Sequence, residues 1–172
     1  MNLPNKITML RIVLIPVFLG LAYAGLMIPA LLVYIIACVS DFVDGRIARK
    51  YNLVTNFGKF MDPLADKVLV LSAMCFFIEA GQMPGWAVAI VLFREFAVSG
   101  LRLIAVEQNR VIAAAWSGKV KTFATMIALG VMMVLPDINF INILATIVIV
   151  ATTIYSGVEY FMVNKDVFKD AD

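Results

Sequence analysis

The chain has 172 residues, of which 63% are hydrophobic and 15% are charged, and its formal net charge is +2. A soluble domain contains about 45–50% apolar and about 25% charged residues, so this composition indicates a protein embedded in a lipid bilayer. The sequence has no histidine, which excludes histidine-based catalytic triads and histidine-ligated metals. The small net charge argues against a nucleic-acid-binding protein.

Apolar segments long enough to span a bilayer, about 20 residues each, follow one another with short polar or Pro/Gly breaks. Six are found, at residues 8–26, 28–49, 58–80, 86–106, 118–135 and 140–163. We therefore expect an all-α, polytopic membrane bundle of six transmembrane helices, forming a single domain over residues 1–172. Residues 1–7 are too short to span and are expected to form a short interfacial segment before the first helix.

The basic residues predict the orientation of these helices, because short loops that cross the membrane avoid Lys and Arg. The loops around residues 25–29, 81–84 and 136–139 contain neither. The opposite helix ends and the termini carry Lys6, Arg11, Arg46, Arg49, Lys50, Lys59, Arg110, Lys119, Lys121, Lys165 and Lys169. Both termini are therefore expected in the cytoplasm, with the chain crossing the cell membrane several times.

The second and third expected helices carry acidic residues at their cytoplasmic ends. Residues 41–66 read DFVDGRIARKYNLVTNFGKFMDPLAD, with carboxylates at Asp41, Asp44, Asp62 and Asp66. At about 100° per residue, the first two share one helix face, and the last two lie on one stripe of the next helix. The short link lets the helices run antiparallel, so the acidic faces can meet. Ionisable groups in membrane segments are costly, which makes this cluster a candidate functional site.

Carboxylates gathered in one small site repel one another, so either some are protonated or a cation lies among them. Oxygen ligands without His or Cys select hard ions, which favours Mg²⁺ or Mn²⁺, and two ions would suit four acids. Such two-metal sites clamp phosphate oxygens. Gly45, Ala48 and Gly58 add no bulk, so a ligand can approach the backbone, and Arg49 offers a fork-shaped phosphate donor.

A purely structural explanation is that these acids form interfacial salt bridges with basic neighbours, namely Arg46, Arg49, Lys59 and Lys67. For a single acid this is as good an explanation as a functional one. It does not explain why the whole set lies on two matched faces beside glycines.

At these residues the sequence resembles the CDP-alcohol phosphatidyltransferase family. The defined positions of the family motif are matched by Asp41, Asp44, Gly45, Ala48, Arg49, Gly58, Asp62 and Asp66, with the family's spacing. The resemblance implies transfer of a phosphatidyl group from CDP-diacylglycerol to an alcohol, with release of CMP. It also implies that Asp41, Asp44 and Asp62 are metal ligands, that Asp66 adds to the metal site and acts as base, and that the protein is a homodimer.

On the nucleotide side, the resemblance implies that Gly45, Ala48, Arg49 and Gly58 line the pocket for the cytidine and pyrophosphate of CDP-diacylglycerol. Asn5, Thr8 and Arg11 are further candidates for contacts with the nucleotide or lipid phosphate. Asn5 or Thr8 could equally cap the first helix.

Other stretches suggest the acceptor alcohol. Residues 2–11, 94–102 (REFAVSGLR) and 118–122 (GKVKT) are similar to the phosphatidylglycerophosphate synthases of this family, which implies sn-glycerol 3-phosphate as the acceptor. Its phosphate needs cations, and the candidates are Arg94, Arg102, Lys119 and Lys121; for the lysines, ordinary topology signalling is the alternative. Arg94 lies well inside the fourth segment, where it needs an anion or Glu95 as partner.

Other functions remain open from the sequence. A sister enzyme of the same family could use another acceptor, as the cardiolipin, phosphatidylserine and phosphatidylinositol phosphate synthases do. A divalent-cation transporter or a structural membrane subunit belongs to other classes, although no charged path continues from the acidic cluster to the other membrane face. The residues do not decide between Mg²⁺ and Mn²⁺, nor do they assign roles to Arg11, Arg110 and Glu159.

Overall fold

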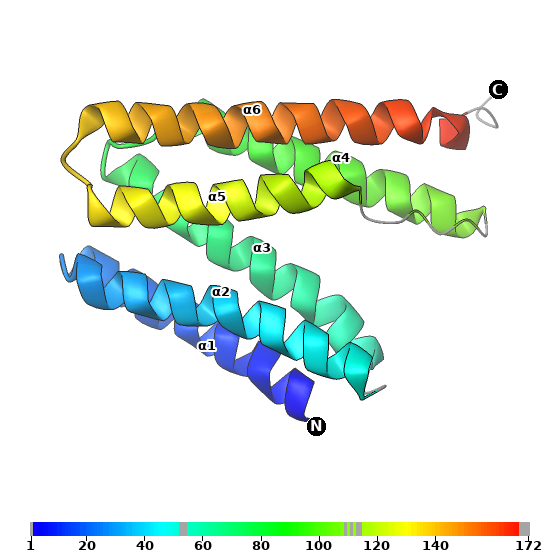
Figure 1. Ribbon diagram of the computed structural model, residues 1–172, viewed down its shortest axis with the longest axis horizontal. Helices are drawn as coiled ribbons and strands as arrows, with labels where there is room; N and C mark the ends of the chain where they lie inside the picture. The colour runs from blue at the N-terminus through cyan, green and yellow to red at the C-terminus, as the bar shows by residue number, and fades with distance from the viewer. Residues whose placement is uncertain (1, 52–54, 109, 111, 113–114, 169–172) are drawn as a thin grey trace.

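The computed structural model describes residues 2–51, 55–108, 110, 112 and 115–168, without the side chains of residues 48–50, 56, 59 and 168. Six α-helices make up most of these residues, which contain no β-strand. They are α1 (Leu3–Tyr23), α2 (Met27–Lys50), α3 (Asn56–Glu79), α4 (Gly85–Glu107), α5 (Trp116–Val134) and α6 (Asn139–Val163), followed by the short 3-10 helix η1 (Lys165–Phe168) (Figure 1). The all-α expectation is confirmed, and each expected segment corresponds to one helix.

The first helix begins earlier than the sequence predicted. The side chain of Asn2 accepts a hydrogen bond of 3.2 Å from the backbone N–H of Asn5, and Pro4 lies in the first turn. Proline suits a first turn because its missing N–H has no partner there in any case. Residues 3–7 are therefore part of α1, so the expected helix boundary at residue 8 is wrong, while the position of these residues at the membrane interface stays a prediction. Because Asn2 is the cap, Asn5 and Thr8 are free for other contacts.

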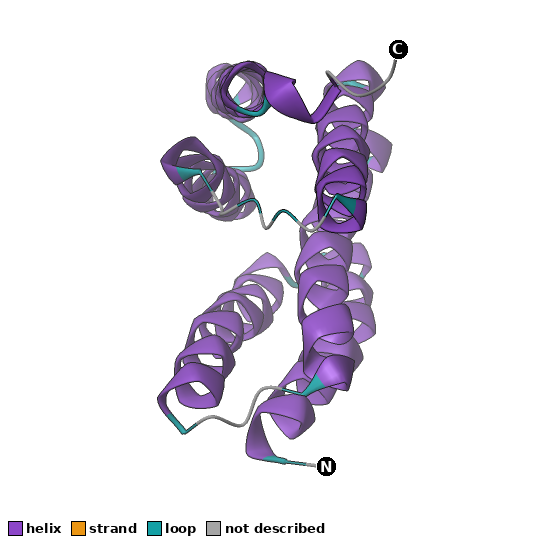
Figure 2. Cartoon of the chain, turned by 90° about the vertical axis from the view of Figure 1, so that its right-hand side faces the viewer, coloured by secondary structure: helices purple, strands orange, loops and turns teal. Residues whose placement is uncertain are grey.

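The helices run back and forth between two ends of the molecule. In Figure 1 both chain termini lie at the same end, where α2 and α4 also finish and α3 and α5 begin. Helix α1 packs against α2 and α3, while α6 packs against α5 and α4. Figure 2 shows the same two groups from the end of the bundle, with α3 and α4 following one another along one side. Residues far apart in sequence are thereby gathered at the end that carries the termini.

Glycines close two of the three turns at the other end. Gly25 and Gly81 have φ angles of 76° and 70°, a left-handed conformation that side chains with a Cβ rarely adopt. They follow α1 and α3 directly, in the position where a helix commonly ends on such a residue. These turns are short because the next helix must start at the same end of the bundle.

The outer surface of the bundle is apolar, as a protein in lipid requires. Phe93, Phe140 and Val163 are each at least 70% exposed. Among the described residues, four helical segments are long and apolar enough to cross a membrane: Leu3–Tyr23, Met27–Ile47, Trp116–Val134 and Asn139–Val163. Helices α3 and α4 have spanning length but carry several charged residues. The chain is thus a multi-pass membrane protein, and most of the charged residues of its helices lie on α2, α3 and α4.

Candidate active site

The acidic residues predicted from sequence lie at the terminus-bearing end of the bundle. Asp41 and Asp44 are on the last turns of α2, and Asp62 and Asp66 are on the first turns of α3. Asp44 is only 1% exposed. We call these four residues the carboxylate site. Because α2 enters this end and α3 leaves it, residues separated by a short link meet there, as the sequence predicted.

Helix α1 supplies two buried partners to this site. The Thr8 hydroxyl donates a hydrogen bond of 2.6 Å to Asp62 Oδ1 and lies 3.4 Å from Asp44 Oδ2. The Arg11 guanidinium binds both acids of α2, with Nη1 2.6 Å from Asp41 Oδ1 and Nη2 2.5 Å from Asp44 Oδ2. Thr8 and Arg11 are both 0% exposed. Helix α1 thus ties the acids of α2 to those of α3.

Gly58 lies where α3 approaches α1. The Thr55 hydroxyl caps α3 by accepting a 3.0 Å bond from the Gly58 N–H, and it donates a 3.1 Å bond to Asn5 Oδ1. A Cβ at position 58 would lie 3.1 Å from Asn5 Oδ1 and 3.3 Å from Thr55 Oγ1. Both contacts are tighter than ordinary packing allows, so the glycine lets α1 and α3 meet beside the carboxylate site.

The donor set of the carboxylate site suits a hard divalent cation. Its carboxylates and the Thr8 hydroxyl are all oxygen ligands, and Asp44 Oδ1 is a buried acceptor without a hydrogen-bond partner. In the described part of the chain, no three acidic or Cys side chains surround one point as metal ligands do. Asp41 and Asp44 are instead bound to Arg11. The residues match a hard cation in the chemistry of their donors, but they are not gathered around one point, and a positive charge already lies against two of them.

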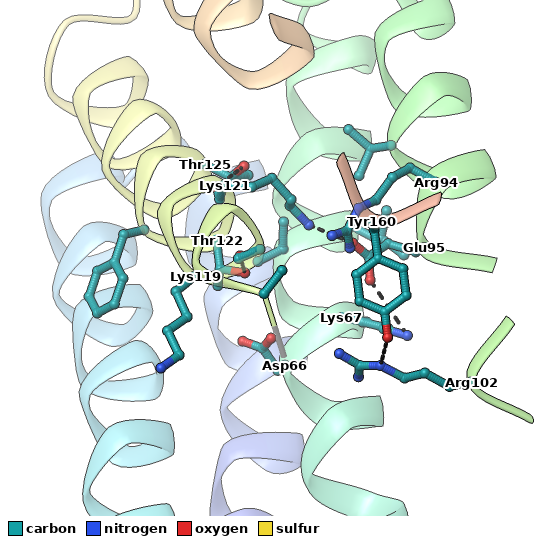
Figure 3. A pocket seen from close by; sticks show the side chains of 16 residues that line it. Asp66, Lys67, Arg94, Glu95, Arg102, Lys119, Lys121, Thr122, Thr125 and Tyr160 are labelled. Atoms are coloured by element: carbon teal, nitrogen blue, oxygen red, sulfur yellow. Dashed lines mark hydrogen bonds and ion pairs between the residues drawn. The ribbon is translucent and has the colours of Figure 1, made fainter. Parts of the chain in front are cut away.

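A second polar site adjoins the first. A cavity of about 310 Å³ lies between α3, α4, α5 and α6, and its lining includes all four cations predicted for the acceptor: Arg94, Arg102, Lys119 and Lys121. Asp66 lines the same cavity (Figure 3). We call it the cationic pocket. The Asp66 carboxylate also lies within electrostatic range of Asp41, so this residue belongs to both sites.

Glu95 organises the cations of the pocket. Its carboxylate is 2.5 Å from Lys121 Nζ, 2.9 Å from Arg94 Nη1 and 3.5 Å from Lys67 Nζ. Figure 3 shows these three side chains converging on Glu95. Of the two partners expected for Arg94, an anion or Glu95, the structure shows Glu95. From the sequence, Lys67 was a candidate only for pairing with the acids of the carboxylate site, and the central position of Glu95 was not predicted, although a charged residue in an apolar segment was a signal for both.

The four predicted cations differ in depth. Arg94 and Lys121 are largely buried, and Arg94 Nη2 also donates a 2.6 Å bond to Ser156 Oγ on α6. Arg102 is exposed and donates a 2.8 Å bond to the hydroxyl of Tyr160. Lys119 is exposed, and its Nζ lies 6.0 Å from the Trp116 ring, so it points away from Glu95 (Figure 3). Tyr160 and Ser156 carried no sequence signal for this site.

The structure says less about three residues predicted for the nucleotide side of the site. Gly45 is a partly exposed residue of α2, and Ala48 and Arg49 are in the same helix, but the side chains of these last two lie outside the described part.

Glu159 lines a separate groove of about 460 Å³ together with Trp116 and Ser117. Arg110 is exposed beyond the end of α4. Neither Glu159 nor Arg110 is among the residues that line the cationic pocket.

Comparison with known proteins places the chain in a family. Residues 1–156 match the family model of CDP-alcohol phosphatidyltransferase. The chain is 42% identical to the CDP-diacylglycerol--glycerol-3-phosphate 3-phosphatidyltransferase of Bacillus subtilis (strain 168), with 99% of each chain covered. It is 40% identical to a probable phosphatidylglycerophosphate synthase of Mycobacterium tuberculosis (strain H37Rv), covering 92% of this chain and 79% of that protein. A Rickettsia typhi relative with the same name as the Bacillus protein is 36% identical, covering 97% of this chain and 99% of that protein.

Proposed function

We propose that this chain, which belongs to the CDP-alcohol phosphatidyltransferase family, transfers the phosphatidyl group of CDP-diacylglycerol to sn-glycerol 3-phosphate. The products are phosphatidylglycerophosphate and CMP, so the enzyme acts in the synthesis of anionic phospholipids. The names of the relatives supply the two substrates. The site supplies the chemical reason: carboxylates that suit metal-assisted phosphoryl chemistry adjoin a pocket of cations that suits a phosphorylated acceptor.

The observation that carries this proposal is the position of Asp66. It is a member of the carboxylate site and also lines the cationic pocket. A group that takes a proton from the acceptor must reach the acceptor's hydroxyl while the donor phosphate is held nearby. Asp66 lies between the carboxylate site and the cationic pocket, so it can reach the acceptor's hydroxyl while the donor phosphate is held at the carboxylate site.

The carboxylate site is the proposed holder of the divalent ions. Asp41, Asp44 and Asp62 would be ligands, with Asp66 adding to the set, and Mg²⁺ or Mn²⁺ is the expected ion because the donors are all oxygen. When bound, such ions neutralise charge on the pyrophosphate of the donor and on the departing CMP. Thr8 holds Asp62 in position through its 2.6 Å hydrogen bond.

The reaction itself requires no covalent intermediate with the protein. Asp66 accepts the proton of the primary hydroxyl of glycerol 3-phosphate, and the hydroxyl oxygen attacks the phosphorus that bears diacylglycerol. A new phosphorus–oxygen bond forms, and the bond between that phosphorus and CMP breaks. The absence of histidine is compatible with this chemistry because a carboxylate serves as the base.

The nucleotide side of the site is proposed to include Gly45, Ala48, Arg49 and Gly58, together with Asn5 and Thr8. Gly58 is buried against the first turns of α1. The hydrogen bonds from Thr55 to Asn5 and from Thr8 to Asp62 hold that part of α1 in place. We assign these α1 residues to shaping the wall against which CDP-diacylglycerol binds.

The acceptor side is proposed to be the cationic pocket. Its lining contains five cations, Lys67, Arg94, Arg102, Lys119 and Lys121, and two carboxylates, Asp66 and Glu95. The excess of positive charge suits a phosphate dianion, and guanidinium groups bind phosphate oxygens in pairs. Arg94 and Lys121 lie deep enough to hold the phosphate, and Arg102 lies at the rim.

We further propose that all six helices span the cell membrane with both termini and the active site in the cytoplasm. The loops at the end opposite the termini contain no Lys or Arg, as expected for translocated loops. The charged residues of α3 and α4 are compatible with spanning because several of them pair inside the bundle. A homodimer is proposed from the family resemblance, and chemical cross-linking in native membranes tests it.

The decisive experiment uses the purified full chain with CDP-diacylglycerol and a panel of acceptors. We expect CMP release with glycerol 3-phosphate, loss of that activity with a chelator, and its return with Mg²⁺ or Mn²⁺. Release of CMP with serine, inositol phosphate or phosphatidylglycerol in place of glycerol 3-phosphate would identify a sister activity instead. Activity that is unchanged by the chelator would refute the metal site while leaving the transfer reaction intact.

A further inference from the structure

Arg11 is a fully buried guanidinium at the centre of the carboxylate site. It is 0% exposed and is among the largest side chains that the bundle buries completely. Each of its Nη atoms binds one acid of α2, Asp41 or Asp44. A charge removed from water in this way is stable only when it is paired, so these two carboxylates and Arg11 depend on each other.

The pairing is incomplete. Arg11 Nε and Asp44 Oδ1 are both buried and have no hydrogen-bond partner. A buried ion pair that served only the fold would be expected to satisfy these atoms, because an unpartnered buried polar group is destabilising. The arrangement instead leaves a carboxylate oxygen of Asp44 available beside the guanidinium.

We infer that Arg11 is an internal counter-ion, which holds Asp41 and Asp44 in the metal-free protein and competes with a divalent cation for their oxygens. The inference rests on the proposed metal site. Its physical basis is that a guanidinium and a divalent cation repel each other when they share the same two carboxylates. Arg11 therefore keeps the acids in place before the metal binds, and metal affinity is lower than the carboxylates alone would give.

Contacts made by Thr8 also help to hold the acids of the carboxylate site in place. Thr8, one turn before Arg11 on α1, binds Asp62 and lies near Asp44. The acids of α2 and α3 are thus held by one helix that carries both a cation and a hydroxyl. Removing the charge of Arg11 should loosen the α2 acids in the metal-free protein but leave the contact of Thr8 with α3.

The test compares Arg11→Met with the wild type for Mn²⁺ binding, measured by electron paramagnetic resonance on the purified full chain without lipid substrate. We expect Arg11→Met to bind Mn²⁺ about tenfold more tightly, because the competing positive charge is gone. Its thermal midpoint in chelator should fall below that of the wild type, and saturating Mn²⁺ should raise the midpoint more than it does in the wild type.

Arg46→Met is the matched control, since the Arg46 guanidinium lies 4.5 Å from the Phe42 ring on the same helix as the acids. It removes one nearby charge without breaking the ion pairs of Arg11, so a clearly smaller change in Mn²⁺ affinity is expected. Arg11→Lys, which keeps the charge, should resemble the wild type. If Arg11→Met does not fold, Arg11→Gln removes the charge but keeps an amide donor, and it should also bind Mn²⁺ more tightly than the wild type. Unchanged or weaker Mn²⁺ binding by Arg11→Met, with binding by the wild type intact, overturns this inference alone. No binding by the wild type overturns the metal site as well.

Discussion

The hydroxyl of Thr8, on the first helix, lies 2.6 Å from the Asp62 carboxylate on the third. Neither residue is near the other in sequence, and the bond closes one side of the carboxylate site. It makes the N-terminal helix part of the carboxylate site.

Replacing Thr8 by Val keeps the shape of the side chain but removes this bond. Loss of a buried hydrogen bond to a carboxylate should cost about 1–3 kcal/mol, seen as a lower thermal midpoint and lower kcat for CMP release. Thr8→Ser retains the hydroxyl and should behave almost like the wild type. Loss of activity in Thr8→Ser with none in Thr8→Val would show that the methyl group, not the bond, matters.

Asp66→Asn should leave the helical fold intact and abolish turnover. A base contributes about 10²–10⁴-fold to such a proton transfer, so CMP release should fall by at least about a hundredfold. The fold is checked by the thermal midpoint in chelator. Appreciable CMP release by the purified variant would remove Asp66 from the role of base.

Lys121 and Lys119 form a matched pair on α5, because one is buried against Glu95 and the other is exposed near Trp116. Lys121→Met should raise the KM for glycerol 3-phosphate about tenfold or more, while the KM for CDP-diacylglycerol changes little. Lys119→Met should have a smaller effect on both. If the KM for CDP-diacylglycerol rises more in either variant, the pocket does not bind the acceptor.

Arg102→Gln tests the rim of the cationic pocket. The variant loses the guanidinium that donates to Tyr160, and the KM for glycerol 3-phosphate should rise several-fold with kcat nearly unchanged, about 1 kcal/mol in binding. Tyr160→Phe removes only the hydroxyl partner and is the control. A greater effect of Tyr160→Phe than of Arg102→Gln would make this contact structural.

Gly58→Ala should push α3 away from α1, since the added Cβ would lie 3.1 Å from Asn5 Oδ1. Overpacking of this kind costs about 1–3 kcal/mol, and activity should fall with the thermal midpoint. Gly20→Ala is the control, because a Cβ there meets nothing within 4 Å. A normal midpoint and activity in Gly58→Ala would show that the contact adjusts without consequence.

The start of the first helix shows where local reasoning failed. Hydropathy placed the beginning at residue 8, whereas the Asn2 cap starts the helix at Leu3. A window of apolar residues does not detect a cap, because the cap is one hydrogen bond from a polar side chain. The error mattered for function, since it separated Asn5 from the helix that carries Thr8 and Arg11.

The sequence by itself determined the membrane character, the six helical segments and the spacing of the four acids, because each follows from composition or from periodicity within one helix. Only the tertiary structure decided which partners these groups have. Arg11 bridges Asp41 and Asp44, and Glu95 gathers cations from three helices. Such pairs depend on how each helix is rotated against its neighbours, and side-chain packing over the whole bundle sets that rotation.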